Sequence, residues 1–374
     1  MKLNQNVRVL DLQGNIVENA RITKLLSFSG LKKEEAKEAI AGDIVVLAGL
    51  EKANVSDTIA SPEVTMPLES KQVDPPTLSM TFSVNDSPLA GTEGSKLTSS
   101  VLKDRLFKEM EGNVSIKISK AQNEDSFDVA GRGELQLGIL IETMRREGFE
   151  ISISKPRVLL KKDDNGKTIE PYEELTVDLD SQYAGSIVES LNKRKGKMIE
   201  MKNIGIDKTR LIFHIPSRGL IGYYSQFLTE TKGTGTMNKI FYQYGPYLGK
   251  LETRHNGVLI SMANGKSVAY ALWNLEDRGQ LFINPNTPIY QGMIIGEHNR
   301  DNDLEVNPIK GKQLSNVRAS GRDEAVRLTP PRQMTLEQAL SYINDDELVE
   351  VTPKSIRLRK KYLDPHERKK NQIK

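Results

Sequence analysis

One duplicated pattern restricts the fold of this chain more than any other feature of its sequence. Residues 131–148 and 217–235 each open with an Arg-Gly turn, continue as an amphipathic helical pattern and end at a glycine. The segments that precede the two turns also have the same order of strand and helix patterns. We therefore interpret the middle of the chain as two copies of one module.

The first copy, residues 75–155, has the clearer periodicity. Residues 78–84 alternate as a half-buried strand, and Ser99 or Ser100 can cap a helix that ends at Gly112. Two further strand patterns, the Arg-Gly helix and a closing strand complete a β-α-β-β-α-β order. This order predicts a split βαβ, or ferredoxin-like, domain with two helices on one face of an antiparallel sheet.

The second copy, residues 156–246, repeats the order less cleanly and is predicted to be a second ferredoxin-like domain. Its first helical pattern ends in a basic cluster formed by Lys193, Arg194 and Lys195. Cations at this position meet the carbonyl end of the helix dipole, so part of their role is predicted to be local. Arg218 follows in the second Arg-Gly turn.

The chain before the modules, residues 1–74, alternates short strand patterns with turns and ends in a proline-rich linker. These patterns predict part of a small β-barrel. Residues 32–40 are charged and fit either a short helix or an exposed loop.

The chain after the modules, residues 247–374, is predicted to be mainly β. Its strand patterns lie at 258–260, 267–275 and 288–296. One helix is predicted to begin at Thr335, because Thr335 and Gln338 have the spacing of a capping box.

Residues 299–323 have no periodicity and are dense in Lys, Arg, Asn and Gly, which predicts a long basic loop. Such loops in compact domains are usually functional or disordered. A basic tail follows near the C-terminus. The fold prediction is thus a multi-domain α+β protein with a partial β-barrel, two ferredoxin-like split βαβ domains, and a mainly β C-terminal domain with one capped helix and a long basic loop.

Composition excludes several kinds of chemistry. The chain has no cysteine, which removes disulfides, thiolate metal ligands and cysteine nucleophiles. Its four histidines lack metal-ligand spacing, and the Gly-Lys pairs at 166–167 and 265–266 lack the earlier glycine of a phosphate-binding loop. We therefore predict no catalytic, cofactor-binding or metal-binding residue. No apolar span or signal peptide is visible, so we expect a cytoplasmic protein.

The net charge of +3 is only mildly basic, so any contact with nucleic acid needs local clusters of cations. Several longer runs of the sequence resemble the BipA (TypA) branch of the translational GTPases. These runs are 41–45 (AGDIV), 131–135 (GRGEL), 144–150 (MRREGFE), 215–222 (IPSRGLIG), 256–261 (NGVLIS), 317–321 (VRASG), 334–340 (MTLEQAL) and 345–353 (DDELVEVTP). The resemblance extends from Arg8 to Lys370, and the order of domains resembles the region after the GTPase domain of elongation factor G.

The resemblance implies the C-terminal part of such a GTPase. Family members begin with a GTPase domain that carries the phosphate-binding loop, and no such domain stands before Met1, so this chain is expected to be a fragment. We expect no enzyme activity and no cofactor on it, with GTP and Mg on the missing domain of the full-length parent. The family binds the ribosome in a GTP-dependent way and supports ribosome assembly and stress adaptation. Only the binding part of that function is expected here.

The resemblance also implies where RNA is contacted. In the family, the C-terminal domain reaches toward the peptidyl-transferase region and the acceptor end of the A-site tRNA through a long loop. The expected partners are the ribosome, especially its large subunit, with rRNA and A-site tRNA, and neither a membrane nor DNA. The cations expected at RNA are Arg300, Lys310, Lys312, Arg318, Arg322, Lys193, Arg194, Lys195, Arg218, Arg357, Arg359, Lys360 and Lys361.

Two alternatives stay open. Residues 299–323 could form a solvated, mobile loop without a role in RNA binding. The chain could also be a self-contained enzyme in which this loop covers an active site as a lid, although no residue pattern supports a catalytic centre.

Overall fold

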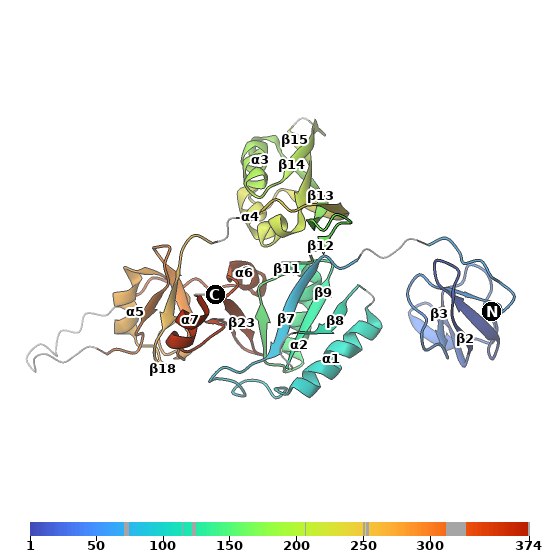
Figure 1. The fold of residues 1–374 in the computed structure, drawn as a ribbon, viewed down its shortest axis with the longest axis horizontal. Coiled ribbons are helices and arrows are strands. Elements are labelled where there is room, and N and C mark those ends of the chain that lie inside the picture. Colours follow the sequence, from blue (N-terminus) through green and yellow to red (C-terminus); the bar gives the residue numbers. More distant parts are fainter. Residues whose placement is uncertain are drawn as a thin grey trace, which may run out of the picture. The chain divides into compact units, whose positions relative to one another are not determined.

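The computed structural model shows two compact units (Figure 1). It describes residues 1–70, 75–113, 115–121, 125–205, 207–249, 251, 254–311 and 327–372. The smaller unit comprises Met1–Asp74 and Gly112–Ser115, and the larger comprises Pro75–Glu111 and Ile116–Lys374. No helix within the described ranges is long and apolar enough to cross a membrane. The chain is a multi-domain α+β protein, as the sequence predicts.

The smaller unit consists of two three-stranded sheets and no closed barrel among its described residues. One sheet has the order β2 (Ile16–Arg21), β1 (Asn6–Leu10) and β6 (Thr58–Ala60). The other has the order β4 (Lys32–Glu35), β3 (Lys24–Ser29) and β5 (Val45–Ala48). Val7, Ile22 and Leu25 form the centre of a small shared core.

A helix, one of the two possibilities predicted for residues 32–40, does not form at residues 32–35. Lys32–Glu35 is an exposed edge strand that pairs antiparallel with β3. Gly30 (φ +62°) lies in the connecting turn, where a positive φ favours glycine. The charged side chains of the strand suit a sheet edge, because they remain solvated and oppose pairing with another chain.

Two helices cover one face of the sheet in the first module. Its elements are β7 (Leu78–Val84), α1 (Ser99–Gly112), β8 (Lys117–Lys120), β9 (Ser126–Gly131), α2 (Glu134–Arg146) and β10 (Ile151–Ser154). Its strands follow the antiparallel path β10-β7-β9-β8, and β11 (Arg157–Val158) also pairs with β7. Leu106 of α1 and Ile141 of α2 share a core with Phe82 of β7.

The second module repeats this topology. Its elements are β12 (Lys161–Lys162), β13 (Thr168–Asp180), α3 (Ala184–Lys193), β14 (Lys197–Asn203), β15 (Lys208–Pro216), α4 (Tyr223–Glu230) and β16 (Thr236–Pro246). The antiparallel path β16-β13-β15-β14 places β16 where the first module has β10. Alternate residues of β13, such as Leu175 and Val177, pack against Ile187 of α3 and Phe227 of α4.

The C-terminal region continues the sheet of the first module. Its elements are β17 (Val258–Ser261), β18 (Gly265–Lys266), α5 (Ala269–Glu276), β19 (Gly279–Leu281), β20 (Pro288–Ile289), β21 (Met293–His298), β22 (Leu304–Val306), α6 (Leu336–Tyr342), β23 (Glu347–Val351), β24 (Ile356–Lys360) and α7 (Pro365–Gln372). β23 pairs with β10, with Val351 opposite Ile151 and Val349 opposite Ile153. Leu340 of α6 packs into the same core as these strands. The first module and the C-terminal region therefore share one sheet and one core.

Two expectations for the C-terminal region are wrong. The predicted strand at 267–275 is largely the helix α5, and Ala271, Leu272 and Leu275 are buried at helical spacing. The predicted loop at 299–323 contains β22, which pairs parallel with β17 and buries Val306. Residues 312–323 of that predicted loop lie outside the described residues.

Thr335 precedes α6 and makes both hydrogen bonds of a capping box. Its side chain accepts a hydrogen bond from the backbone N–H of Gln338, and the Gln338 side chain accepts one from the backbone N–H of Thr335. Each bond satisfies a donor at the helix start that has no partner within the helix.

Candidate nucleic-acid interface

Lys360, one of the cations predicted to contact RNA, is buried in β24. Its ammonium lies 2.7 Å from Asp303, 2.7 Å from Asp346 and 2.9 Å from Glu347. Burial by itself would lower the pKa of Lys360, but the Glu347 carboxylate and the bonds to the two aspartates raise it to about 12. Lys360 is therefore charged and neutralised inside the protein.

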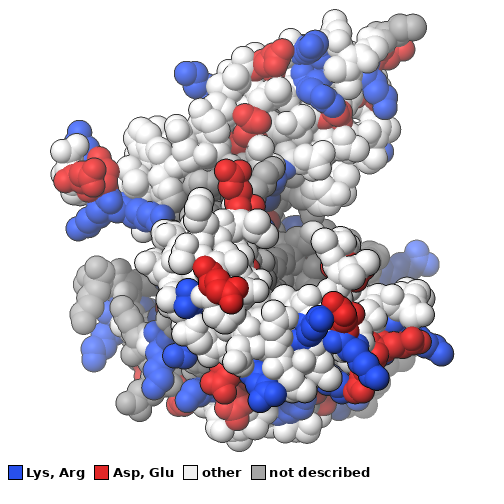
Figure 2. All heavy atoms as spheres, turned by 90° about the vertical axis from the view of Figure 1, so that its right-hand side faces the viewer, with Lys and Arg blue, Asp and Glu red and all other residues white. Residues whose placement is uncertain are grey.

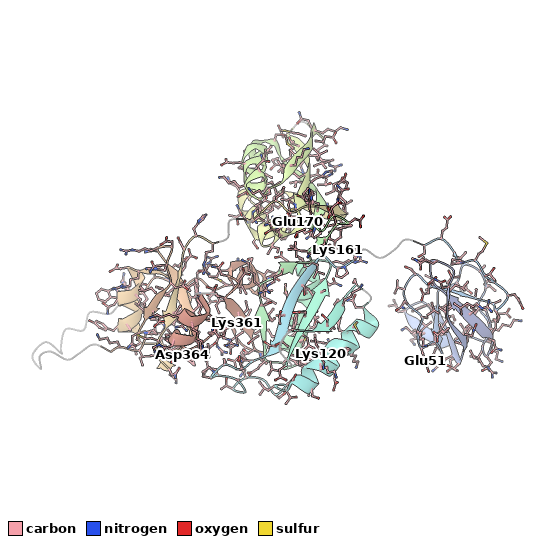
Figure 3. All side chains as sticks on the ribbon, in the orientation of Figure 1. Glu51, Lys120, Lys161, Glu170, Lys361 and Asp364 are labelled. Carbon is pink, nitrogen blue, oxygen red and sulfur yellow. The ribbon has the colours of Figure 1, made fainter. Side chains whose placement is uncertain are left out.

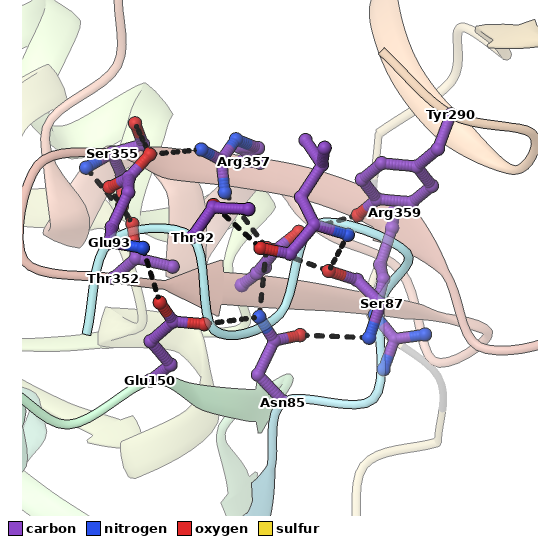
Figure 4. A network of polar contacts seen from close by, with 12 residues as sticks. Asn85, Ser87, Thr92, Glu93, Glu150, Tyr290, Thr352, Ser355, Arg357 and Arg359 are labelled. Carbon is purple, nitrogen blue, oxygen red and sulfur yellow. Dashed lines mark hydrogen bonds and ion pairs between the residues drawn. The ribbon is translucent and has the colours of Figure 1, made fainter. Parts of the chain in front are cut away.

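Arg357 and Arg359 lie in the same strand and also pair with carboxylates, and Figure 4 shows the pair that Arg357 forms with Glu93. Arg357 pairs with Glu93 and lies 2.9 Å from Glu350. Arg359, whose side chain is 2% exposed, pairs with Asp86. Glu93 and Asp86 come from the loop after β7, so their ion pairs hold the C-terminal region against the first module, whereas Glu350 lies on the adjacent strand β23.

Two buried carboxylates complete the network of Figure 4. Glu350 accepts hydrogen bonds from the side chains of Asn85 (3.0 Å), Ser87 (2.9 Å) and Tyr290 (2.5 Å). Glu150 accepts backbone N–H bonds from Gly91, Glu93 and Gly94. Burial would raise the pKa of Glu150, but these N–H donors hold it below its ordinary value. Glu150 and Glu350 thus have internal hydrogen-bond partners, whereas the Nε and Nη1 atoms of Arg359 are buried without a partner among the described residues.

The RNA contacts predicted for Arg357, Arg359 and Lys360 in the basic tail do not fit the burial of their side chains. Asp86 and Glu93, which pair with Arg359 and Arg357, are distant in the sequence, whereas Glu347 lies opposite Lys360 on the neighbouring strand β23. Lys361 is the exposed member of the group, with its ammonium 5.7 Å from the centre of the Tyr362 ring (Figure 3).

Arg218 also has an internal partner. It pairs with Glu170 of β13, a buried residue labelled in Figure 3, and its own side chain is 12% exposed. The guanidinium carbon lies 4.5 Å from the centre of the Tyr247 ring. Glu170 also accepts the backbone N–H of Leu248 at 2.9 Å. Arg218 thus connects the second Arg-Gly turn to the end of β16, and the prediction of an RNA contact does not fit its burial.

Arg194 supports the same turn from the end of α3. It donates to the carbonyl of Gly219 (2.9 Å) and to the Gln226 side chain (2.9 Å), and its guanidinium carbon lies 4.9 Å from the centre of the Tyr223 ring. Burial lowers the pKa of Arg194. Its donors are directed into the module, so the predicted RNA contact is also not supported for this residue.

Lys193 and Lys195, in contrast, are exposed. The Lys193 ammonium lies 2.7 Å from Glu189 one turn earlier in α3, an exposed pair of small energetic value. Lys195 has φ +66° and follows the helix end, where its N–H bonds to Asn192 and the N–H of Gly196 bonds to Leu191. This is a Schellman motif with lysine at the position that usually holds glycine.

The two repeated Arg-Gly turns meet in space. Glu134, the first residue of α2, accepts the backbone N–H of Gly222 at 3.0 Å. Gly222 has φ +68°, and a Cβ added there would lie 2.3 Å from the Cβ of Ser341 in α6. Burial raises the pKa of Glu134. The turns therefore form the junction between both modules and the C-terminal region.

A group of exposed cations lies in the C-terminal region. Arg278 follows α5, Arg300 follows β21, and Lys310 follows β22. The backbone N–H of Asn299 donates to the carbonyl of Arg278 at 2.9 Å, so the first two turns are adjacent. None of the three cations forms an ion pair with another residue that the structure describes. Of the remaining loop cations, Lys312, Arg318 and Arg322 lie outside the described residues.

A cavity of about 420 Å³ adjoins this group. It is lined by Tyr270, Ala271, Asn274, Leu275, Arg278, Glu305, Val306, Asn307 and Lys310. Sequence reasoning did not single out Arg278, which follows α5. It also missed Tyr270 and Asn274, because residues 267–275 were assigned to a strand. The helical spacing of the buried apolar residues in α5 was the signal that could have placed them on one face.

Charge elsewhere is mixed. On the face that Figure 2 shows, Lys and Arg side chains alternate with Asp and Glu side chains and form no single basic patch. Within the described ranges, no group of three or more His, Asp or Glu side chains could hold a metal ion.

Two family models match adjacent segments of the chain. Residues 167–255 match the model described as the elongation factor G C-terminus. Residues 256–365 match the model described as the TypA/BipA C-terminal domain.

Curated relatives extend the similarity over nearly the whole chain. A protein of Salmonella typhimurium named large ribosomal subunit assembly factor BipA is 48% identical over 371 residues, which is 99% of this chain and 61% of the relative. The protein of the same name from Bacillus subtilis is 46% identical over 99% of this chain and 60% of the relative. The chain thus spans about three fifths of the length of these relatives.

Proposed function

Because this chain belongs to the BipA (TypA) family, we propose that it binds the ribosome, contacts RNA and acts in assembly of the large ribosomal subunit. Both relatives carry the name of a large-subunit assembly factor, and the similarity covers 99% of the chain. The alternative of a self-contained enzyme has no supporting observation among the described residues. The full-length parent is inferred to be a translational GTPase.

The exposed cations Arg278, Arg300 and Lys310 carry this proposal. They are charged, solvent-accessible and not paired within the described residues, whereas Arg218 and Lys360 already have internal partners. Guanidinium and ammonium groups of this kind bind the phosphates of RNA without reading its sequence. The inferred partners are rRNA of the large subunit and A-site tRNA, and ribosome binding implies a cytoplasmic location.

We interpret the two modules as ferredoxin-like domains that carry and orient the C-terminal region. Their shared β-α-β-β-α-β order and identical strand paths support this interpretation. The exposed Lys193 and Lys195 at the end of α3 form a second candidate contact with RNA.

Co-sedimentation with purified ribosomal subunits at varied salt tests the proposal. We expect the chain to sediment with the large subunit, with an affinity that falls as salt rises because phosphate contacts release counterions. Arg300→Gln should weaken binding and reduce the slope of log affinity against log salt concentration by about one, because one phosphate contact is lost. Arg146→Gln, a control with a side chain 79% exposed on α2, should leave both unchanged. Absence of binding, or binding that is independent of salt, would refute the proposed function.

A further inference from the structure

The cavity beside α5 combines an apolar floor with a polar rim. Ala271, Leu275 and Val306 are buried and form the floor. The backbone N–H of Val268 donates to the carbonyl of Pro308 at 3.0 Å, which fixes α5 against the segment after β22. A volume of about 420 Å³ lies within the usual range of sites for small molecules, about 300 to 1,000 Å³. A site of this size can take one nucleotide but not a duplex.

The amides at the rim leave one acceptor and one donor available. The Asn274 Nδ2 donates to the carbonyl of Tyr270 at 2.8 Å, so its Oδ1 is directed elsewhere as an acceptor. The Asn307 Oδ1 accepts the backbone N–H of Ile309 at 3.1 Å, so its Nδ2 remains a donor. No further bond to either amide is present within the described residues. The edge of an unpaired base needs this combination of donor and acceptor.

Tyr270 and the cations supply the other two contacts that a nucleotide requires. Tyr270 is a half-buried aromatic residue of the lining, and bases of RNA stack on such rings. Arg278 and Lys310 provide positive charge for a phosphate. Glu305, the single carboxylate of the lining, is 2.8 Å from Arg368, a buried residue that neutralises it.

We propose that this cavity binds a single unpaired nucleotide of RNA, with its base against Tyr270, its edge at Asn274 and Asn307, and its phosphate at Arg278 and Lys310. The inference rests on the proposed function and adds to it a specific site. A nucleotide held in this way anchors the C-terminal region at an unstacked position of RNA. The cations outside the cavity, in contrast, contact only the phosphate backbone.

Trp273, the single tryptophan of the chain, makes the site measurable. Its side chain is 49% exposed on α5, and its ring centre lies 6.3 Å from that of Tyr270. Binding of a short unstructured RNA oligonucleotide to the full chain should therefore change its fluorescence. Tyr270→Leu keeps apolar bulk but removes the ring, and should weaken binding about 5- to 160-fold. Tyr270→Phe should retain the affinity.

Salt dependence separates the two kinds of contact. Tyr270→Leu should leave the slope of affinity against salt unchanged, because no charge is removed, whereas Lys310→Gln should make the slope shallower. Tyr224→Leu, which removes an aromatic side chain 54% exposed on α4, is the matched control and should bind RNA normally. Circular dichroism and thermal unfolding establish that each variant is folded.

The possible failures are distinguishable. If the chain sediments with the large subunit but Tyr270→Leu binds the oligonucleotide as tightly as the unmodified chain, the cavity is not a nucleotide site and the proposed function stands. If the chain binds neither ribosomes nor RNA, both proposals fail. If adenosine or guanosine monophosphate binds as tightly as the oligonucleotide, the site takes free nucleotides and the assignment to RNA is overturned.

Discussion

Gly222→Ala should destabilise the junction of the two modules and the C-terminal region. Gly222 has φ +68°, and an added Cβ would lie 2.3 Å from the Cβ of Ser341. The left-handed backbone costs an alanine about 1 to 2 kcal/mol. Overpacking against α6 adds about 1 to 3 kcal/mol. We therefore expect a total cost of about 2 to 5 kcal/mol.

Gly233→Ala separates the two contributions. Gly233 has φ +77°, but nothing lies within 4 Å of its added Cβ. The Gly233→Ala variant therefore loses stability only through the strain of a left-handed backbone at alanine. The difference between the two variants, about 1 to 3 kcal/mol, measures the overpacking. Ser341→Gly removes the opposing Cβ and should therefore restore much of the stability in the double variant with Gly222→Ala.

Hydrogen exchange followed by mass spectrometry, with denaturant unfolding, measures these effects. Faster exchange in α6 is expected for Gly222→Ala but not for Gly233→Ala, because the clash is local to Ser341. The double-variant cycle isolates the contact energy. Equal costs for the two alanine variants, or no recovery on Ser341→Gly, would refute the packing of Gly222 against α6.

Three further predictions concern charged residues. Glu134→Gln keeps an acceptor for Gly222 and removes a half-buried charge, so it should raise the melting temperature at pH 7. Since burial raises the pKa of Glu134 in the folded state, protonation of the carboxylate relieves the same penalty, and the gain should shrink as pH falls through that raised pKa. A gain that is independent of pH would contradict this cause. Lys195→Gly should stabilise the chain by about 0.5 to 1 kcal/mol in thermal unfolding, because glycine adopts φ +66° without strain, and no gain would mean that the lysine is not strained there. Lys360→Met should cost about 3 to 5 kcal/mol at pH 7 by leaving carboxylates uncompensated. Burial alone would raise the pKa of Glu347, but the hydrogen bond from Arg254 and the charge of Lys360 hold this pKa below its ordinary value of 4.5. The ionised Glu347 therefore stabilises the fold above pH 4.5, and this stabilisation is lost as the pH falls below that value. The cost of Lys360→Met should therefore decrease in acid, and a cost unchanged between pH 7 and pH 4 would contradict the argument.

Local periodicity allowed the sequence to predict much of the secondary structure. Alternating Leu175, Val177 and Leu179 indicate a strand with one buried face, and these residues lie in β13 with that face in the core. The duplicated order of strands and helices could also be predicted, because the same succession of strand and helix periodicities occurs in residues 75–155 and 156–246. The family was recognisable from long runs of residues, which need no knowledge of the fold. Short elements such as α5 were misassigned, because a few apolar residues fit both periods.

Only the tertiary structure decided which charges are available for binding. Lys360 and Arg300 are both basic residues in polar surroundings of the sequence, yet Lys360 is buried among carboxylates and Arg300 is exposed. The β23–β24 hairpin creates this difference, because it places Lys360 opposite Glu347, and Asp303 approaches the same ammonium from the segment before β22. The contact of Glu134 with Gly222 likewise joins two turns that are distant along the chain. Periodicity reports which face of an element is apolar, but the partner of a charged side chain depends on segments that approach only when the chain folds.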